Sequence, residues 1–426
     1  MPDSDFLDHK GRKRIVITGL GPVSSIGIGI DEYFDGLATG KNGVSLLEGK
    51  EFDAMEHPER DRLVAAQIKD FDIDNYLKIP KIKRRSDRFS QFALVGAYHA
   101  LSNANLLNDE DKYSLRSYLA GVFLGVGIGG ETTVETNHIQ MLEKGFKGVS
   151  PFLISNVMSN AAPGNISIEF GINGPAQSIA TACATSSYAT VDAIRAIRSG
   201  DIDVAITGGV DACITPLVYS GFITNHALSE FGPTRPFDKE RDGFVIGEGA
   251  GIYIIESLEH AFQRDAPILA EIVGYGLTSD GKHITNIASS GINYAMVLAM
   301  NEGDISKCKI DYINAHGTST PNNDKSESFE IESLFTDYLD QIFVSSTKSQ
   351  IGHTVAAAGG LETIACVWAI LNNQVPPNLN YKTPDPEINV RVPTTIHTPH
   401  EIKVVLNNSL GFGGHNACLA IKQYKP

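Results

Sequence analysis

The sequence has 426 residues, 42% of them hydrophobic, which is enough for one large buried core or for two fused domains. Its formal net charge of -15 argues against a general nucleic-acid binder, because phosphate binding requires a surplus of Lys and Arg.

The first residues of the chain and the pattern of cysteines indicate in which cellular compartment the protein is expected. The first residues, MPDSDFLDHKGRKR, are polar and charged and lack the apolar segment of a secretory signal. The five cysteines are scattered without a CxxC pair, which indicates neither a disulfide framework nor a zinc site. A reducing cytoplasm is the location that these features favour. The cysteines are Cys183, Cys213, Cys308, Cys366 and Cys418.

Short runs with high β propensity alternate with helical patterns along the whole chain. In chain order the predicted strands are RIVITG (14–19), SYLAGVFLG (117–125), DVAITGG (203–209), GIYIIES (251–257), KIDYINAHG (309–317), IFVSSTK (342–348), KVVLNNS (403–409) and CLAIKQY (418–424). This alternation predicts an α/β fold with a layered sheet. The segments 200–234 and 372–386 are rich in Gly or in Asn and Pro, and we interpret them as loops inside the fold.

Two stretches of small residues repeat the same design in the two halves of the chain. TACATSSYATVDAIRAIRSGD passes from Cys183 into a predicted helix, and IGHTVAAAGGLETIACVWAILNN does the same from His353. Residues 355–371 are the most membrane-like stretch, but two glycines and Glu362 favour a buried core helix. Two similar halves predict that Cys183 and His353 share a central cleft.

Cys183 is the candidate nucleophile. It follows the strand-like SIATA and precedes a helix, so its sulfur is expected to face the backbone N–H groups of the helix start. A free thiol with a pKa near 8.5 is only about 3% ionised at pH 7, and a pKa of about 7 favours the anion by roughly 2 kcal/mol. We therefore expect a lowered pKa and a thiolate. For any single cysteine, a small buried core residue is the alternative, and the other four keep that interpretation.

His316 and His353 are candidate proton donors. His316 ends a predicted strand at NAHGTSTP, and His353 lies in SSTKSQIGH, again between a strand and a helix. Each histidine alone could equally be a structural residue. Three such positions in Gly, Ser and Thr surroundings together favour an active site.

At these residues the sequence resembles the β-ketoacyl-acyl carrier protein synthases of the decarboxylating I/II group, most closely type II. The likeness runs from about Arg14 to Lys422. Its most specific segments are TACATSS, GGVDACITPL, RPFDKERDGFVIGEGAG, NAHGTSTPNNDKSE, SSTKSQIGH and NSLGFGGHN. The resemblance implies the thiolase fold: two duplicated βαβαβαββ halves in five α-β-α-β-α layers. The expected halves are residues 1–265, which carry the cysteine, and 266–426, which carry both histidines.

The resemblance also implies a mechanism. Cys183 would attack the thioester of an acyl carrier protein, while the N–H groups of Cys183 and Phe412 stabilise the oxyanion. His316 and His353 would then donate hydrogen bonds to the enolate that forms as malonyl-carrier protein loses carbon dioxide. Lys348, paired with Glu362, would set the electrostatics of the site. No cofactor and no metal is required.

Several further residues take their expected roles from the family. Phe412, between glycines in LGFGG, would be a gate, and Leu410 stands where the family commonly has Phe, which bears on the gate's movement. Ile128, Phe222 and Phe412 could instead simply pack on the core. Ile128 and Phe222 would border the acyl pocket, and Thr318 and Thr320 would bind the pantetheine arm. A structural monovalent cation would lie at Asn314, Glu362, Asn407 and Asn408.

The segment KIPKIKRRSDRF is basic in a net acidic protein. A solvated helix face is the plain interpretation, but acyl carrier proteins are acidic, and electrostatic steering is the natural use of such a segment. Members of the family bind their acyl carrier protein at this segment, and Lys81, Arg84 and Arg85 match the residues that bind it. His226 replaces an arginine that relatives often have beyond Phe222, which suggests weaker or pH-sensitive docking.

Other enzyme classes fit less well. GVGIGG or GLGPVSS could be a dinucleotide-binding turn, but no second strand with an acidic end follows at the required distance. A degradative thiolase would use a second cysteine near GFGGHN, and starter-type condensing enzymes have Asn in place of the second histidine. A silent chain-length-determining subunit would lack the cysteine.

The resemblance further implies a homodimer whose partner is acyl carrier protein, with no nucleic acid and no membrane insertion. A specialised polyketide role stays open beside fatty-acid elongation. The sequence does not determine the acyl chain length.

Overall fold

In the computed structural model, which describes residues 3–284, 290–398 and 401–425, one order of strands and helices occurs twice. The first repeat runs β1 (Ile15–Ser24), α3 (Arg88–Asn103), β5 (Ala120–Val126), α6 (Ala161–Phe170), β6 (Ala176–Ile179), α7 (Thr185–Ser199), β7 (Val204–Asp211) and β8 (Gly249–Ser257). The second runs β9 (Ala270–Ser279), α10 (Ser290–Glu302), β10 (Tyr312–Asn314), α11 (Pro321–Phe335), β11 (Phe343–Ser345), α13 (Ala358–Asn372), β12 (Val404–Gly411) and β13 (His415–Lys422).

The strand orders of the two repeats match as well. The first sheet has the order β6-β5-β7-β8-β1, and the second has the order β11-β10-β12-β13-β9. In the first sheet β5 is parallel to both of its neighbours, β6 and β7, and in the second β10 is parallel to both of its neighbours, β11 and β12. The remaining pairs within each sheet are antiparallel. A short antiparallel ladder between β1 and β9, with Ile15 opposite Ile272, joins the sheets edge to edge. The predicted duplicated α/β fold is therefore confirmed.

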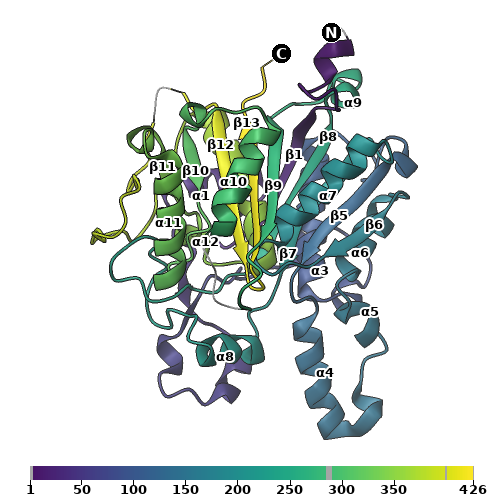
Figure 1. Ribbon diagram of the computed structural model, residues 1–426. Helices are drawn as coiled ribbons and strands as arrows, with labels where there is room; N and C mark the ends of the chain where they lie inside the picture. Colours follow the sequence, from purple (N-terminus) through teal and green to yellow (C-terminus); the bar gives the residue numbers. More distant parts are fainter. Residues whose placement is uncertain (1–2, 285–289, 399–400, 426) are drawn as a thin grey trace.

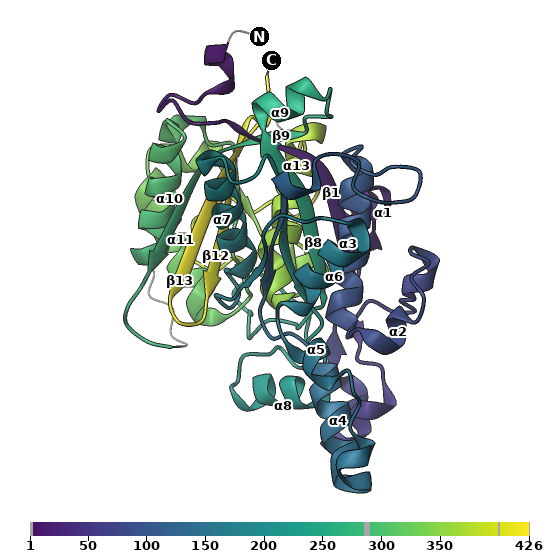
Figure 2. The same cartoon turned by 90° about the vertical axis from the view of Figure 1, so that its right-hand side faces the viewer.

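Helices lie in three layers around the two sheets. Helix α3 packs on β1 and β8, and α10 packs on β9 and β13, so each covers an outer face. Helices α7 and α13 lie between the sheets and contact each other. Figure 2 shows this succession from α10 and α11 on one side to α3 and α6 on the other. These are the five layers that the family resemblance implies.

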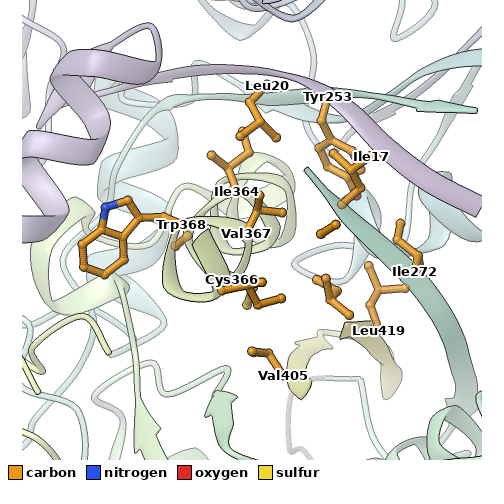
Figure 3. Packing of buried hydrophobic residues seen from close by; sticks show 14 of the residues in the cluster. Ile17, Leu20, Tyr253, Ile272, Ile364, Cys366, Val367, Trp368, Val405 and Leu419 are labelled. Atoms are coloured by element: carbon orange, nitrogen blue, oxygen red, sulfur yellow. The ribbon is translucent and has the colours of Figure 1, made fainter. Parts of the chain in front are cut away.

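Helix α13 is the centre of the core. All of its side chains from Ala358 to Ile370 are buried, and Figure 3 shows Ile364, Val367 and Trp368 projecting from it in different directions. The 355–372 segment is long and apolar enough to cross a membrane, yet 89% of it is buried inside the molecule. The prediction of a buried core helix is confirmed.

The close packing of α13 depends on glycine. A Cβ atom at Gly251 of β8 would lie 2.1 Å from the Leu361 nitrogen, and one at Gly360 would lie 2.2 Å from the Gly251 oxygen. Only two glycines let these backbones approach so closely.

Smaller elements surround the two repeats. They are β2 (Gly27–Ile28), α1 (Ile30–Thr39), β3 (Ser45–Leu46), β4 (Val64–Ala65), α2 (Ile82–Arg85), α4 (Glu131–Lys144), α5 (Leu153–Val157), α8 (Pro216–Thr224), α9 (Leu258–Gln263) and α12 (Lys348–Ile351). Figure 1 shows α4, α5 and α8 at the end of the molecule opposite both termini.

The predicted strands are all present, but several elements differ from expectation. Strand β9 and the two-residue strands β2, β3 and β4 were not among the predicted strands, and β6 begins two residues before the strand-like SIATA that precedes Cys183. Helix α8 lies in the segment 200–234 that we interpreted as loop; Thr215 caps its N-terminus through Val218 N, and Pro216 opens it. Segment 372–386 follows α13 as a loop inside the fold, with Asn378 buried in it.

Candidate active site

Cys183 lies in a tight turn between β6 and α7. Ala182 before it has a φ of 50°, in the left-handed region that alanine rarely adopts. The turn is held by the Thr185 hydroxyl, which accepts from Thr181 N at 2.7 Å, and by Ala184 N, which donates to Thr181 O at 3.2 Å. This strain presents the sulfur at the wall of a cavity of about 640 Å³.

The expected lowering of the Cys183 pKa is wrong. Burial raises the pKa of this thiol to about 12, against the opposing effects of Lys348 and of the Phe412 N–H, while Asp211 and Glu362 raise it further. The helix start does not outweigh the removal of water and the two nearby carboxylates. In the free site the sulfur is therefore a thiol at neutral pH, and it loses its proton only as it reacts.

His353 lies beside the sulfur. Its Nε2 is 3.1 Å from Cys183 Sγ, and Val355 N donates to its Nδ1 at 3.3 Å. A ring that accepts at Nδ1 carries its proton on Nε2 when it is neutral. Burial, with Lys348, holds the pKa of His353 well below its usual range, so the ring is a neutral donor aimed at the reacting atoms.

His316 is the second donor. Its ring centroid is 5.5 Å from that of His353, and the two planes are nearly perpendicular at 85°. Lys348 Nζ donates to the His316 carbonyl at 2.7 Å and lies 3.3 Å from Nδ1, which leaves Nε2–H free to face the cavity. Burial, Lys348 and His353 keep the His316 pKa well below its usual range.

Lys348 stands behind the histidines and not in the cavity. It is fully buried at the start of α12 and forms an ion pair with Glu362 on α13, which is also fully buried. The predicted Lys348–Glu362 pair is thus present. It places one cation where it acts on both histidines and on the thiol.

The remaining predicted pocket residues line the same cavity. Ile128 and Phe222 lie on its wall with Thr318 and Thr320, whose hydroxyls are 2.9 Å apart. Phe412 lies there too, in the β12–β13 turn. Leu410 and His226, the two residues that differ from those common in the family, also line the cavity. Sequence segments that are far apart therefore meet in one place.

Buried carboxylates complete the site, and the sequence interpretation missed them. Glu327 accepts from His316 N and Gly317 N, each at 2.9 Å, and burial raises its pKa to about 7. Asp324, one turn earlier on α11, accepts from Ser319 N and Phe237 N. Their spacing of three residues directly after the NAHGTSTP turn was the available signal. Asp211, at the end of β7, carried no such signal.

Part of the expected cation site has suitable ligands. Asn314 Oδ1, Asn407 Oδ1 and Glu362 Oε2 are buried without a hydrogen-bond partner in the part of the chain that the structure describes. Buried orphan oxygens of this kind are where an ion or a water belongs. The Asn408 side chain points to the other face of β12, where its Nδ2 donates to Glu327 and Met296, and its Oδ1 is likewise buried without a hydrogen-bond partner within the described ranges. No cluster of three or more His, Cys, Asp or Glu suits a metal among the described residues.

The expected docking residues lie on the surface. Lys81, Arg84 and Arg85 are exposed at α2, a helix of four residues. Lys83 within the same run is bound to Asp72 and Asp74 instead.

Comparison with known proteins agrees with this geometry. The family model for the beta-ketoacyl synthase N-terminal domain matches residues 12–261, and the C-terminal domain model matches residues 269–382. The chain belongs to the beta-ketoacyl synthase family. The prediction of a condensing enzyme that acts as an acyltransferase is thereby confirmed.

Relatives of the synthase match over almost the whole chain. A 3-oxoacyl-[acyl-carrier-protein] synthase 2 of Synechocystis is 40% identical, covering 97% of this chain and 99% of that protein. The synthase 2 of Staphylococcus aureus strain N315 has the same identity and coverages, and the chloroplastic synthase I of Hordeum vulgare is 38% identical, with coverages of 97% and 90%.

Solved structures share the fold of this synthase. The ishigamide ketosynthase/chain length factor is 32% identical with a TM-score of 0.89, covering 97% of this chain and all of that one. A type II polyketide ketosynthase in complex with its acyl-carrier protein is 29% identical with a TM-score of 0.87 and the same coverages.

Proposed function

We propose that this synthase joins the acyl group of an acyl-carrier protein to malonyl-carrier protein, with loss of carbon dioxide, and so elongates fatty acids by two carbons. The observation that carries the proposal is the 3.1 Å contact between Cys183 Sγ and His353 Nε2, with the His316 ring beside it in one cavity. A nucleophile next to two neutral donors fits acyl transfer followed by enolate stabilisation.

The first step loads the enzyme. The Cys183 sulfur attacks the thioester carbonyl, the carrier sulfur leaves, and the thiol proton passes to that sulfur. The Phe412 N–H points at Sγ, and the Cys183 N–H lies near Gly411, the residue before Phe412; in this proposal these two N–H groups stabilise the oxyanion. A high thiol pKa is compatible with this step, since no free thiolate accumulates.

The second step forms the new bond. Malonyl-carrier protein loses carbon dioxide, and the negative charge moves to the thioester oxygen, where His316 Nε2–H and His353 Nε2–H donate. The enolate carbon attacks the acyl carbonyl on Cys183, and the sulfur leaves and takes up a proton. Neutral histidines suit this role, because they donate without giving up their protons completely.

The surrounding residues hold these groups. Lys348 fixes His316 through its carbonyl and supplies positive charge to the site. A monovalent cation bound by Asn314, Asn407 and Glu362 would supply further positive charge near Lys348. Ile128 and Phe222 border the acyl chain, Thr318 and Thr320 bind the pantetheine arm, and Phe412 is the gate between the two substrate states.

The partner is acyl carrier protein, which docks on Lys81, Arg84 and Arg85. Support comes from the exposure of these cations and from the related ketosynthase that was solved with its acyl-carrier protein. A homodimer in the cytoplasm is part of the same proposal, and all five cysteines being unbridged agrees with a reducing compartment.

The test is a reconstituted condensation with a ladder of acyl-carrier proteins and malonyl-carrier protein, read by mass spectrometry of both enzyme and products. Wild type should give an acyl adduct on Cys183 and 3-oxoacyl products. Cys183→Ala should lose the adduct and lower product by on the order of 1,000-fold.

His353→Asn is the matched variant, because it should keep the adduct and lose decarboxylation. Wild type that forms neither adduct nor product with any carrier would instead favour a silent partner subunit. Repeated condensation to a polyketide chain would favour the specialised role of the structural relatives.

A further inference from the structure

The carboxylate of Asp211 lies behind the reaction cavity, and the mechanism above does not use it. Asp211 ends β7 and its side chain is fully buried. It is close enough to Cys183 to raise the pKa of that thiol. A buried carboxylate beside a nucleophile opposes thiolate formation, so its presence calls for a different physical reason.

Asp211 accepts hydrogen bonds from two backbone segments. Oδ1 accepts from Ile128 N at 3.0 Å, and Oδ2 accepts from Ala356 N at 2.9 Å. The N–H groups of Gly127 and Gly129 also point at the carboxylate. The first segment belongs to the β5–α4 loop of the first repeat, and the second belongs to the turn before α13 of the other repeat.

Each of these segments carries a part of the site. The Ile128 side chain lines the cavity at the expected acyl wall. Val355, directly before Ala356, has a φ of 49°, a conformation that a β-branched residue adopts only when its surroundings hold it there. Its N–H is the group that donates to His353 Nδ1. The strained turn therefore orients His353, and Asp211 holds the turn.

We propose that Asp211 is a positioning residue of the condensation, which fixes the acyl wall at Ile128 with one oxygen and the orientation of His353 with the other. The inference rests on the proposed function. It assigns to one side chain both the shape of the acyl pocket and the placement of the decarboxylation donor.

Only an ionised carboxylate suits this position. Four N–H donors converge on it, and its two oxygens offer enough lone pairs for all of them. Asparagine has the same shape but one acceptor oxygen, and its NH₂ group would oppose the remaining donors. Burial raises the Asp211 pKa to about 6, and the four N–H groups limit that rise, so the group is charged at neutral pH.

The test compares Asp211→Asn with Asp238→Asn in the full-length protein. Asp238 is a matched control, because it too is buried and accepts from backbone N–H groups, at Glu240, Lys382 and Thr383, but none of these three donors lines the cavity, whereas Ile128 does. Three quantities are measured for each folded variant: the rate of Cys183 acylation, the rate of malonyl-carrier decarboxylation, and kcat/KM across the acyl-carrier ladder.

For Asp211→Asn we expect acylation within about threefold of wild type and decarboxylation lower by on the order of 10-fold to 100-fold, because His353 is displaced. The chain-length profile should flatten as Ile128 loosens. Asp238→Asn should lower the acylation rate, the decarboxylation rate and kcat/KM by one common factor, and it should leave the chain-length profile unchanged.

Adding Val355→Gly provides a rescue. Glycine adopts a positive φ without support, so Asp211→Asn/Val355→Gly should recover decarboxylation but not the chain-length profile. This double variant also tests the proposal if the single variant folds poorly. The proposal is overturned if Asp211→Asn keeps both the decarboxylation rate and the profile, or loses every rate by one factor. Wild type without product would mean instead that the proposed function has failed.

Discussion

The Cys183 thiol lies among one buried cation, Lys348, and two buried carboxylates, Asp211 and Glu362. Of these three, Lys348 acts most strongly on the thiol pKa and is the one that lowers it. Among the charged groups, the residue that most favours the thiolate is therefore one that does not touch the sulfur, although burial outweighs it. The expectation from the helix start was wrong because burial, with Asp211 and Glu362, raises the thiol pKa, and no local pattern around Cys183 shows that burial or those carboxylates.

We predict that Lys348→Met raises the Cys183 pKa further. Alkylation of Cys183 by iodoacetamide, measured as a function of pH, should have its midpoint shifted upward, because the thiolate loses its stabilising cation. The variant should also be less stable by about 3–5 kcal/mol, since it leaves Glu362 as an unpaired buried charge.

Lys348→Met/Glu362→Gln separates these two effects. Removal of both charges should restore most of the stability. The alkylation midpoint should still lie above that of wild type, because Lys348 affects the thiol more than Glu362 does. An unchanged midpoint in both variants would contradict this electrostatic account.

At the scale of elements, glycines set how closely helices approach the sheets. Strand β9 went unpredicted because Gly274 and Gly276 interrupt its β-type pattern. These glycines stand where α10 crosses the strand; a Cβ at either would lie within 2.1 Å of a helix carbonyl. The two glycines lower the β propensity of this segment, yet close packing of the helix on the strand requires them. Strands β1 and β8 also have glycines against helix backbone, at Gly19, Gly21 and Gly251, but their remaining residues form long enough runs of high β propensity to predict a strand.

We predict that Gly251→Ala strongly destabilises the fold. The added methyl would overlap the backbone of α13 at Gly360 and Leu361, and overpacking a core of this kind costs about 1–3 kcal/mol or more. Chemical denaturation should give the difference directly. Gly164→Ala is the matched control: a Cβ there meets nothing within 4 Å, and in helix α6 it should stabilise by about 0.5–1 kcal/mol. Equal effects of the two changes would be inconsistent with this packing.

At the scale of the molecule, a basic surface segment stands out against the net charge of -15. We predict that Arg84→Glu/Arg85→Glu lowers kcat/KM for carrier-bound substrates by about tenfold at low salt, and less at high salt, because it removes electrostatic attraction. The rate with a small acyl thioester that lacks the carrier protein should not change.

Lys307→Glu/Lys309→Glu provides the control for net charge. Both lysines are exposed, in the second repeat between α10 and β10, and the charge change equals that of the arginine pair. Steady-state kinetics should show no effect on carrier substrates. A similar loss in both double variants would mean that total charge, and not the α2 segment, attracts the carrier.

The sequence predicted the duplicated fold and the reacting side chains, since both follow from local runs of residues. It did not predict Asp211, Asp324 or Glu327, because the burial of a carboxylate depends on segments far away in the chain. Nor did it predict that Asn407 and Asn408 point to opposite faces of β12, toward α13 and toward Glu327 respectively.

Helix α13 belongs to the second repeat, yet it covers β8 of the first, and β1 pairs with β9. A ribosome completes every strand of the first repeat, and the helix α7 that covers β5 and β7, before it makes α13, which covers most of β8. The nascent first repeat therefore emerges with the apolar face of β8 incompletely covered and with the edge of β1 unpaired. The helix that completes this cover lies near the end of the chain. Native contacts of such long sequence separation make folding slow, and the growing chain depends on protection from aggregation until synthesis ends.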